Sequence, residues 1–149
     1  MEVNVNEIPP NGLGLEKIES AKVLDIERSD IEFTKDVLIK AKIKREYDSI
    51  RIYLDIESEI SFSCARCLEN ESKIFFEHFD IIKDAKEQRT IDLLQVAREE
   101  IILTYPEKLL CHENCKGLCQ QCGRNRNVHT CRCEDNENSV GIHIDRLDN

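Results

Sequence analysis

The chain has 149 residues, with 21 Lys and Arg residues against 30 Asp and Glu residues, which gives a formal net charge of −9. A chain of this length can bury one sizeable core, and its acidic balance argues against an indiscriminate binder of polyanions. A membrane span requires a run of roughly 20 apolar residues, and the sequence contains none. Its N-terminus does not resemble a signal peptide. We therefore expect a cytoplasmic protein whose thiols stay reduced.

Three segments of the first hundred residues have patterns typical of β-strands. Apolar residues alternate with lysines in residues 37–44, VLIKAKIK, and with charged residues in residues 50–62, IRIYLDIESEISF. Residues 72–83, SKIFFEHFDIIK, are rich in aromatic and β-branched residues. Residues 2–5 and 22–26 are weaker strand candidates.

One helix is predicted at about residues 91–105, IDLLQVAREEIILTY, with apolar residues along one face. Thr90 is the expected N-cap, Asp92 suits the first turn, and Pro106 should end the helix. The expected fold class is α+β, an antiparallel β-rich domain with one long packed helix over residues 1–110. A cysteine-rich, metal-stapled segment should follow at 111–133, and then a polar tail at 134–149.

Eight cysteines fall in four closely spaced pairs. The pairs are Cys64 and Cys67, Cys111 and Cys115, Cys119 and Cys122, and Cys131 and Cys133. In a cytoplasmic chain this pattern favours metal over disulfides, and a structural zinc ion takes four ligands in a tetrahedron.

The simplest grouping gives two structural zinc ions. One would be held by Cys119, Cys122, Cys131 and Cys133, and the other by Cys64, Cys67, Cys111 and Cys115. His112 could replace Cys111, and His129 could compete in the other set. An iron–sulfur cluster and thiol redox chemistry are the open alternatives.

Two segments are basic despite the acidic average. Residues 35–45 and residues 108–133 each contain five Lys or Arg residues and one acidic residue, a local charge of +4. Two zinc ions bound by eight thiolates would offset the second of these charges, so anion binding there depends on where the arginines point. The candidate nucleic-acid contacts are Lys40, Lys42, Lys44, Arg45, Arg124 and Arg126. The Arg and Asn residues of the loop between Cys122 and Cys131 could instead cap turns and hydrogen-bond the thiolates.

The motif CARCL at residues 64–68, the helix with its YPEKLLC end, and the segment CKGLCQQCGRNRN…CRC together resemble the YceD-type large ribosomal RNA subunit accumulation proteins. The residues that carry the likeness are Cys64, Arg66, Cys67, Leu68, Asp92, Leu93, Glu99, Glu100, Pro106, Cys115, Gly117, Leu118, Cys119, Cys122, Gly123, Asn125 and Asn127. The tail departs from the family, because HIDRLDN stands where a stretch like D-P-R-L is common.

The resemblance implies a factor that supports accumulation of large-subunit ribosomal RNA, with no enzymatic activity. The sequence is consistent with the absence of enzymatic activity, since no set of residues in it matches a known catalytic motif. Two partners are expected from the sequence: the ribosomal RNA itself, or a basic ribosomal protein that meets Asp55, Glu57 and Glu59. A redox or metal-transfer protein is a third, less favoured class.

Overall fold

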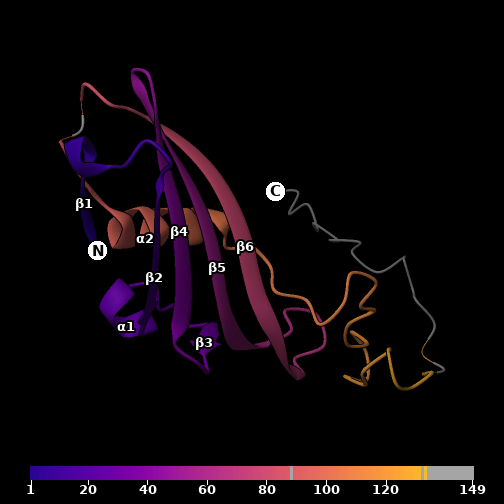
Figure 1. The fold of residues 1–149 in the computed structure, drawn as a ribbon. Coiled ribbons are helices and arrows are strands. Elements are labelled where there is room, and N and C mark those ends of the chain that lie inside the picture. Colours follow the sequence, from indigo (N-terminus) through magenta and orange to yellow (C-terminus); the bar gives the residue numbers. More distant parts are fainter. Residues whose placement is uncertain (88, 132, 134–149) are drawn as a thin grey trace, which may run out of the picture.

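The protein is described by a computed structural model covering residues 1–87, 89–131 and 133. Figure 1 shows an antiparallel sheet with one long helix, α2, across one of its faces. The elements in chain order are β1 (Glu2–Asn4), the 3-10 helix η1 (Val5–Glu7), β2 (Leu13–Glu19), α1 (Ala21–Leu24), β3 (Ile31–Phe33), β4 (Val37–Glu46), β5 (Ser49–Ser63), β6 (Asn70–Asp84), β7 (Thr90–Asp92) and α2 (Leu93–Thr104). The predicted fold class is confirmed.

In the main sheet, β2 pairs with β4 and β4 pairs with β5. Strand β3 pairs with the last part of β5, beyond the residues that pair with β4, and β6 pairs with β5 along its whole length. The three long strands of the sheet, β4, β5 and β6, are the three predicted from the sequence. Alternate residues of β4 and β5 are buried, as the period of two requires. A second, two-stranded sheet pairs β1 with β7.

The core lies between the sheet and α2. The inward residues of β4 and β5, such as Ile39, Leu54 and Ile56, are fully buried and belong to the same cluster as Leu93 and Ile101 of the helix. The hydroxyl of Tyr105, just after α2, donates a hydrogen bond of 2.6 Å to the carbonyl of Ile26. This contact fixes the point at which the chain leaves the core and starts toward the cysteines.

Two local predictions are wrong. Residues 22–26 are not a strand, because Ser20 accepts a hydrogen bond from the Val23 N–H and starts the short helix α1. The N-cap of α2 is Asp92 rather than Thr90, since residues 90–92 pair with β1 as strand β7. Strands β2 and β3 were not predicted.

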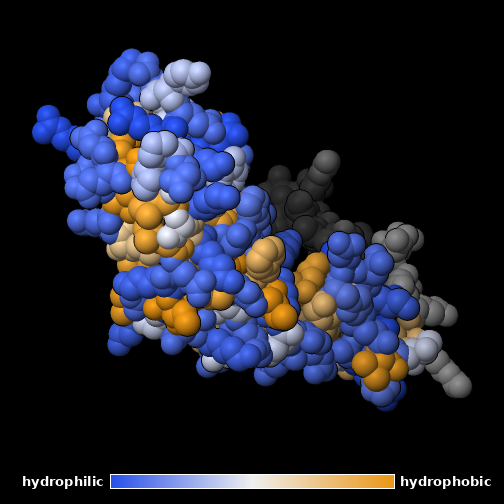
Figure 2. Space-filling view, in the orientation of Figure 1, coloured by the Kyte–Doolittle hydropathy of each residue, from blue (hydrophilic) through white to orange (hydrophobic). Residues whose placement is uncertain are grey.

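The outer face of the sheet, turned away from α2, mixes charged and apolar residues. Pairing places Lys40 between Glu16 of β2 and Asp55 of β5, and it places Glu57 between Leu38 and Phe76. Figure 2, in the orientation of Figure 1, shows separate hydrophobic areas on this face bordered by hydrophilic residues. The face therefore carries no uniform charge.

The segment after α2 contains no helix or strand in its described residues, only an isolated bridge between Leu118 and Asn125. The expected tail at 134–149 lies outside the described residues. Within the described ranges, no helix is long and apolar enough to cross a membrane.

Candidate metal centres and nucleic-acid interface

The first cysteine tetrad joins two distant parts of the chain. Cys64 and Cys67 lie in the turn between β5 and β6, and Cys111 and Cys115 follow α2. The turn closes through a hydrogen bond of 2.9 Å from the Leu68 N–H to the Cys64 carbonyl. The Ala65 N–H donates to the Leu109 carbonyl at 2.8 Å and brings the segment after α2 against this turn.

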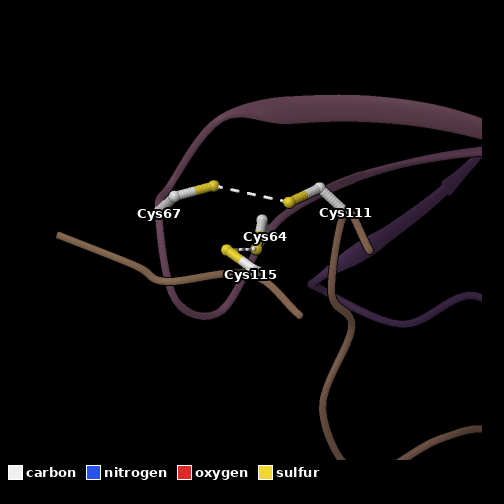
Figure 3. Close-up of side chains that lie close together, drawn as sticks. All are labelled: Cys64, Cys67, Cys111 and Cys115. Atoms are coloured by element: carbon white, nitrogen blue, oxygen red, sulfur yellow. Dashed lines mark hydrogen bonds between the residues drawn. The ribbon is translucent and has the colours of Figure 1, made fainter. Parts of the chain in front are cut away.

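The four sulfurs of this tetrad point toward one another (Figure 3). The Sγ atoms of Cys64 and Cys115 lie 3.8 Å apart, those of Cys67 and Cys111 lie 3.7 Å apart, and all four lie within 4.8 Å of one another. A disulfide needs about 2.05 Å, so these are free thiols. Three of the four residues are buried, and Cys111 is half-buried.

The second tetrad consists of Cys119, Cys122, Cys131 and Cys133, whose sulfurs also lie within 4.8 Å of one another. Its turn repeats the first, because the Gly123 N–H donates to the Cys119 carbonyl at 2.8 Å. The residue after each CxxC pair has a left-handed backbone, with φ of 61° at Leu68 and 70° at Gly123. The sulfurs thus gather in the two sets expected from the sequence. Their binding of metal stays a prediction.

The first cysteine of each CxxC turn has a lowered pKa. Burial acts to raise the pKa of Cys64, but backbone N–H groups of Cys111, Cys67 and Arg66 donate to its sulfur and bring the pKa to about 6. Backbone N–H groups of Cys122 and Gln121 likewise lower the pKa of Cys119 to about 6. These amides favour the thiolate, the form that binds metal.

One thiol in each tetrad has a strongly raised pKa. Burial and the neighbouring sulfurs raise the pKa of Cys111 to about 12, and the sulfurs of the second tetrad, Cys122 foremost, raise that of Cys133 to about 12. Each cluster resists full deprotonation by itself, because four thiolates would repel one another. A bound cation would remove this obstacle.

The donor set fits a single tetrahedral ion such as zinc. With Zn–S bonds of about 2.3 Å, a regular tetrahedron separates its sulfurs by about 3.8 Å. Two of the six sulfur–sulfur distances in the first tetrad, 3.8 and 3.7 Å, are close to this value, and none exceeds 4.8 Å. In iron–sulfur clusters the cysteines are divided among several irons, which holds their sulfurs farther apart. The ligands of each ion would be the four cysteines of its tetrad.

The two histidines considered as ligands lie outside both tetrads. His112 Nδ1 lies 3.1 Å from the Cys111 sulfur, within hydrogen-bonding distance. The backbone N–H of His129 donates to the Asn125 carbonyl at 2.9 Å, and its side chain is exposed.

Three further residues shape the first tetrad, and all three are among those that carry the family resemblance in the sequence. Arg66 Nη1 donates to the Cys115 carbonyl at 2.9 Å, and the Arg66 carbonyl accepts from the Leu118 N–H at 3.0 Å. Gly117 has φ of 71° and passes so close that a Cβ there would lie 3.0 Å from the Arg66 carbonyl oxygen. Asn127 Nδ2 donates to the Cys115 sulfur at 3.2 Å. Each of the three lies within a few residues of a cysteine in the sequence, and this position is the feature from which a role at the metal site could have been predicted.

The predicted basic contacts fall on two separate surfaces. Lys40, Lys42 and Lys44 point to the outer face of β4, and Arg45 follows the inner-face register at the exposed end of the strand. The three lysines therefore form a row that Arg45 does not join. Arg124 and Arg126 are exposed in the loop between Cys122 and Cys131.

The comparisons with known proteins gave one match. Residues 80–141 match the family model described as Large ribosomal RNA subunit accumulation protein YceD. The match confirms the resemblance over the helix and the whole cysteine-rich segment 111–133, and the CARCL motif at 64–68 lies outside it. No curated protein and no solved structure matched the chain.

Proposed function

We propose that this protein is a non-enzymatic, cytoplasmic factor that supports accumulation of large-subunit ribosomal RNA by binding that RNA. The family match over residues 80–141 supports the role in ribosomal RNA accumulation. The observation that carries RNA binding is the exposed pair Arg124 and Arg126 in a loop anchored at both ends by cysteines of one tetrad.

The fixed path of this loop is what makes it suited to RNA. The Cys119 N–H donates to the Arg124 carbonyl at 2.8 Å, and the Arg126 N–H donates to the Gly117 carbonyl at 2.9 Å. The backbone at both arginines is thereby held, and less conformational entropy is lost when they bind phosphate. We assign the two tetrads to structural zinc ions that hold this loop and dock it on the sheet domain.

The lysine row of β4, formed by Lys40, Lys42 and Lys44, is the second proposed RNA contact, and fewer observations support it. Among the described residues, Lys40, Lys42 and Lys44 form no ion pair, so their ammonium groups are available. However, Glu16 and Asp55 flank Lys40 on the same face and reduce its attraction for phosphate. We expect this row to contribute less than the arginine loop.

The test is ultraviolet crosslinking in cells followed by sequencing of the attached RNA, paired with binding to that RNA in vitro. R124E/R126E should weaken binding most, K40E/K42E/K44E less, and K22E, at an exposed lysine of α1 that belongs to neither surface, should serve as control. Each phosphate contact that is lost should also reduce the slope of log K against the logarithm of the salt concentration by about 1. Scattered crosslinks, or binding that does not change with salt, would refute RNA binding.

A protein partner is the second candidate, because of one feature of the outer face. Phe76 is 58% exposed and Ile74 is 71% exposed, and their cross-strand neighbours on β5 are Glu57 and Glu59. An apolar and acidic surface of this kind suits a lysine-rich protein better than RNA. Association with ribosomal particles that survives nuclease treatment and is lost in E57K/E59K would favour this candidate over direct RNA binding.

A further inference from the structure

One side chain connects the two tetrads. Asn127 belongs to the loop that the second tetrad closes, yet its amide lies against the first tetrad. Its Nδ2 donates to the Cys115 sulfur at 3.2 Å, and its Oδ1 accepts from the Lys116 N–H at 2.7 Å. The side chain is half-buried between the two sites.

The orientation of this amide follows from its partners. A backbone N–H can only donate, so the atom that faces Lys116 must be the oxygen, and the NH2 group must face the sulfur. The second hydrogen of Nδ2 goes to Asn125 Oδ1 at 2.9 Å. All three polar contacts of the amide are therefore used, and the donor toward Cys115 cannot be exchanged by a flip.

The loop that carries Asn127 depends on the second tetrad. Asn125 Oδ1 accepts from the Asn127 N–H at 2.9 Å, and together with the backbone bonds from Cys119 and Arg126 this folds residues 124–127 onto residues 117–119. The loop buries little apolar surface, since Arg124, Arg126 and Val128 are exposed. The Asn125 amide also donates to Glu69 Oε1 at 3.4 Å, and cysteines at the two ends of the loop, Cys122 and Cys131, restrain it further.

We propose that Asn127 is a positioning residue that couples the two metal sites. An ion in the second tetrad holds the loop in the fold that presents the Asn127 amide to Cys115, and the first tetrad then binds its ion more tightly. Because linkage is reciprocal, an ion in the first tetrad tightens binding at the second by the same factor. This inference rests on the metal binding proposed above, and it is independent of RNA binding.

The test follows zinc loss from each tetrad during chelator titration of the full-length protein. Alkylation of cysteines, read by peptide mass spectrometry, reports Cys64 and Cys67 for the first site and Cys131 and Cys133 for the second. N127A should lower the zinc affinity of the first site by about 10-fold, the lower end of what loss of a partner to a ligand costs. It should lower the affinity of the second site as well, although Asn127 touches no sulfur there.

A cycle of variants separates coupling from a local effect. C122S/C131S, which breaks the second site, should weaken the first site by a similar factor, and adding N127A to it should have little further effect. N114A is the matched control, because Asn114 is exposed in the same segment and its side chain forms no hydrogen bond among the described residues. N127D keeps the oxygen for Lys116 but turns an oxygen toward Cys115, so it should weaken the first site at least as much as N127A even if the loop stays folded.

Two results would overturn the inference in different ways. Wild-type protein that binds fewer than two zinc ions would refute the metal assignment and the coupling with it. Two ions bound with no effect of N127A, or an equal loss from N127A in the C122S/C131S chain, would refute the coupling alone.

Discussion

At the scale of single residues, Gly117 shows how closely the cysteine segment docks on the β5–β6 turn. Both Gly117 and Gly123 have a left-handed backbone, with φ of 71° and 70°. A Cβ at position 117 would lie 3.0 Å from the Arg66 carbonyl oxygen and 3.3 Å from the Arg66 Cβ, whereas at position 123 nothing lies within 4 Å. The two glycines therefore share the conformational requirement and differ in the contact.

We expect G117A to loosen zinc at the first tetrad more than G123A loosens it at the second. Each substitution costs about 1–2 kcal/mol for a non-glycine residue in this conformation, and G117A must also displace the Arg66 backbone. The measurement is the chelator concentration that removes half of the zinc from each site. Equal effects of the two variants would show that the close contact with Arg66 does not contribute to zinc affinity at the first tetrad.

At the scale of elements, the start of α2 is set by pairing between β7 and β1. Asp92 Oδ1 accepts from the Leu94 N–H at 3.0 Å. Burial acts to raise the pKa of Asp92, but this bond and the amino group of Met1 outweigh it and lower the pKa. D92A should therefore lower the free energy of unfolding by about 1 kcal/mol in denaturant titrations at neutral pH.

Two variants serve as controls for this cap. D92N keeps a side-chain oxygen and should cost less, and T90A should change stability little, because Thr90 is exposed in β7 and caps nothing. Since the native pKa is lowered, the part of the advantage over Ala that depends on the charge of Asp92 is complete above the usual Asp pKa and is lost as the pH falls through the native value. A larger effect of T90A than of D92A would restore Thr90 as the cap.

Two adjacent phenylalanines in β6 test which face of the sheet is buried. Phe75 is 6% exposed, with ring centroids 6.4 Å from Phe33 and 6.4 Å from Tyr105, whereas Phe76 is 58% exposed on the outer face. F75A should cost about 3 kcal/mol or more of unfolding free energy, and F76A less than about 0.5 kcal/mol. Similar losses would contradict the register of β6. A stable F76A that no longer associates with ribosomal particles would favour a protein partner.

The elements differ in how well the sequence predicts them. Strands β4 and β5 are buried on one face only, so their alternation is clear. In β2, Lys17 and Glu19 stand in the inward register and are half-buried, so the alternation fails at this edge strand. The spacing of cysteines indicated both tetrads because ligands of one ion must be close. The role of Asn127 depends on how one loop folds onto another, which spacing alone does not encode.

At the scale of the whole molecule, the protein has two cores of different kinds. The apolar core between the sheet and α2 ends at Leu109, and the cysteines of the first tetrad form a separate buried cluster with Leu110 and Leu118 around it. The sheet core contains many fully buried aliphatic side chains and none of the eight cysteines. The cysteine cluster has few apolar neighbours, so its stability should depend on the ions it binds.

Removal of metal should therefore separate the two cores. With a chelator present, amide hydrogens of residues 111–131 and of the turn at 64–69 should exchange rapidly, because the bonds from Ala65 to Leu109 and from Leu118 to Arg66 lose their support. The amides of β4 and β5 should stay protected, since both strands are paired on each side and bury the main core. Hydrogen exchange read by mass spectrometry distinguishes the outcomes. Loss of protection in β4 and β5 together with the cysteine segment would mean that the ions stabilise the entire fold, and that no variant of the tetrads can test RNA binding separately from folding.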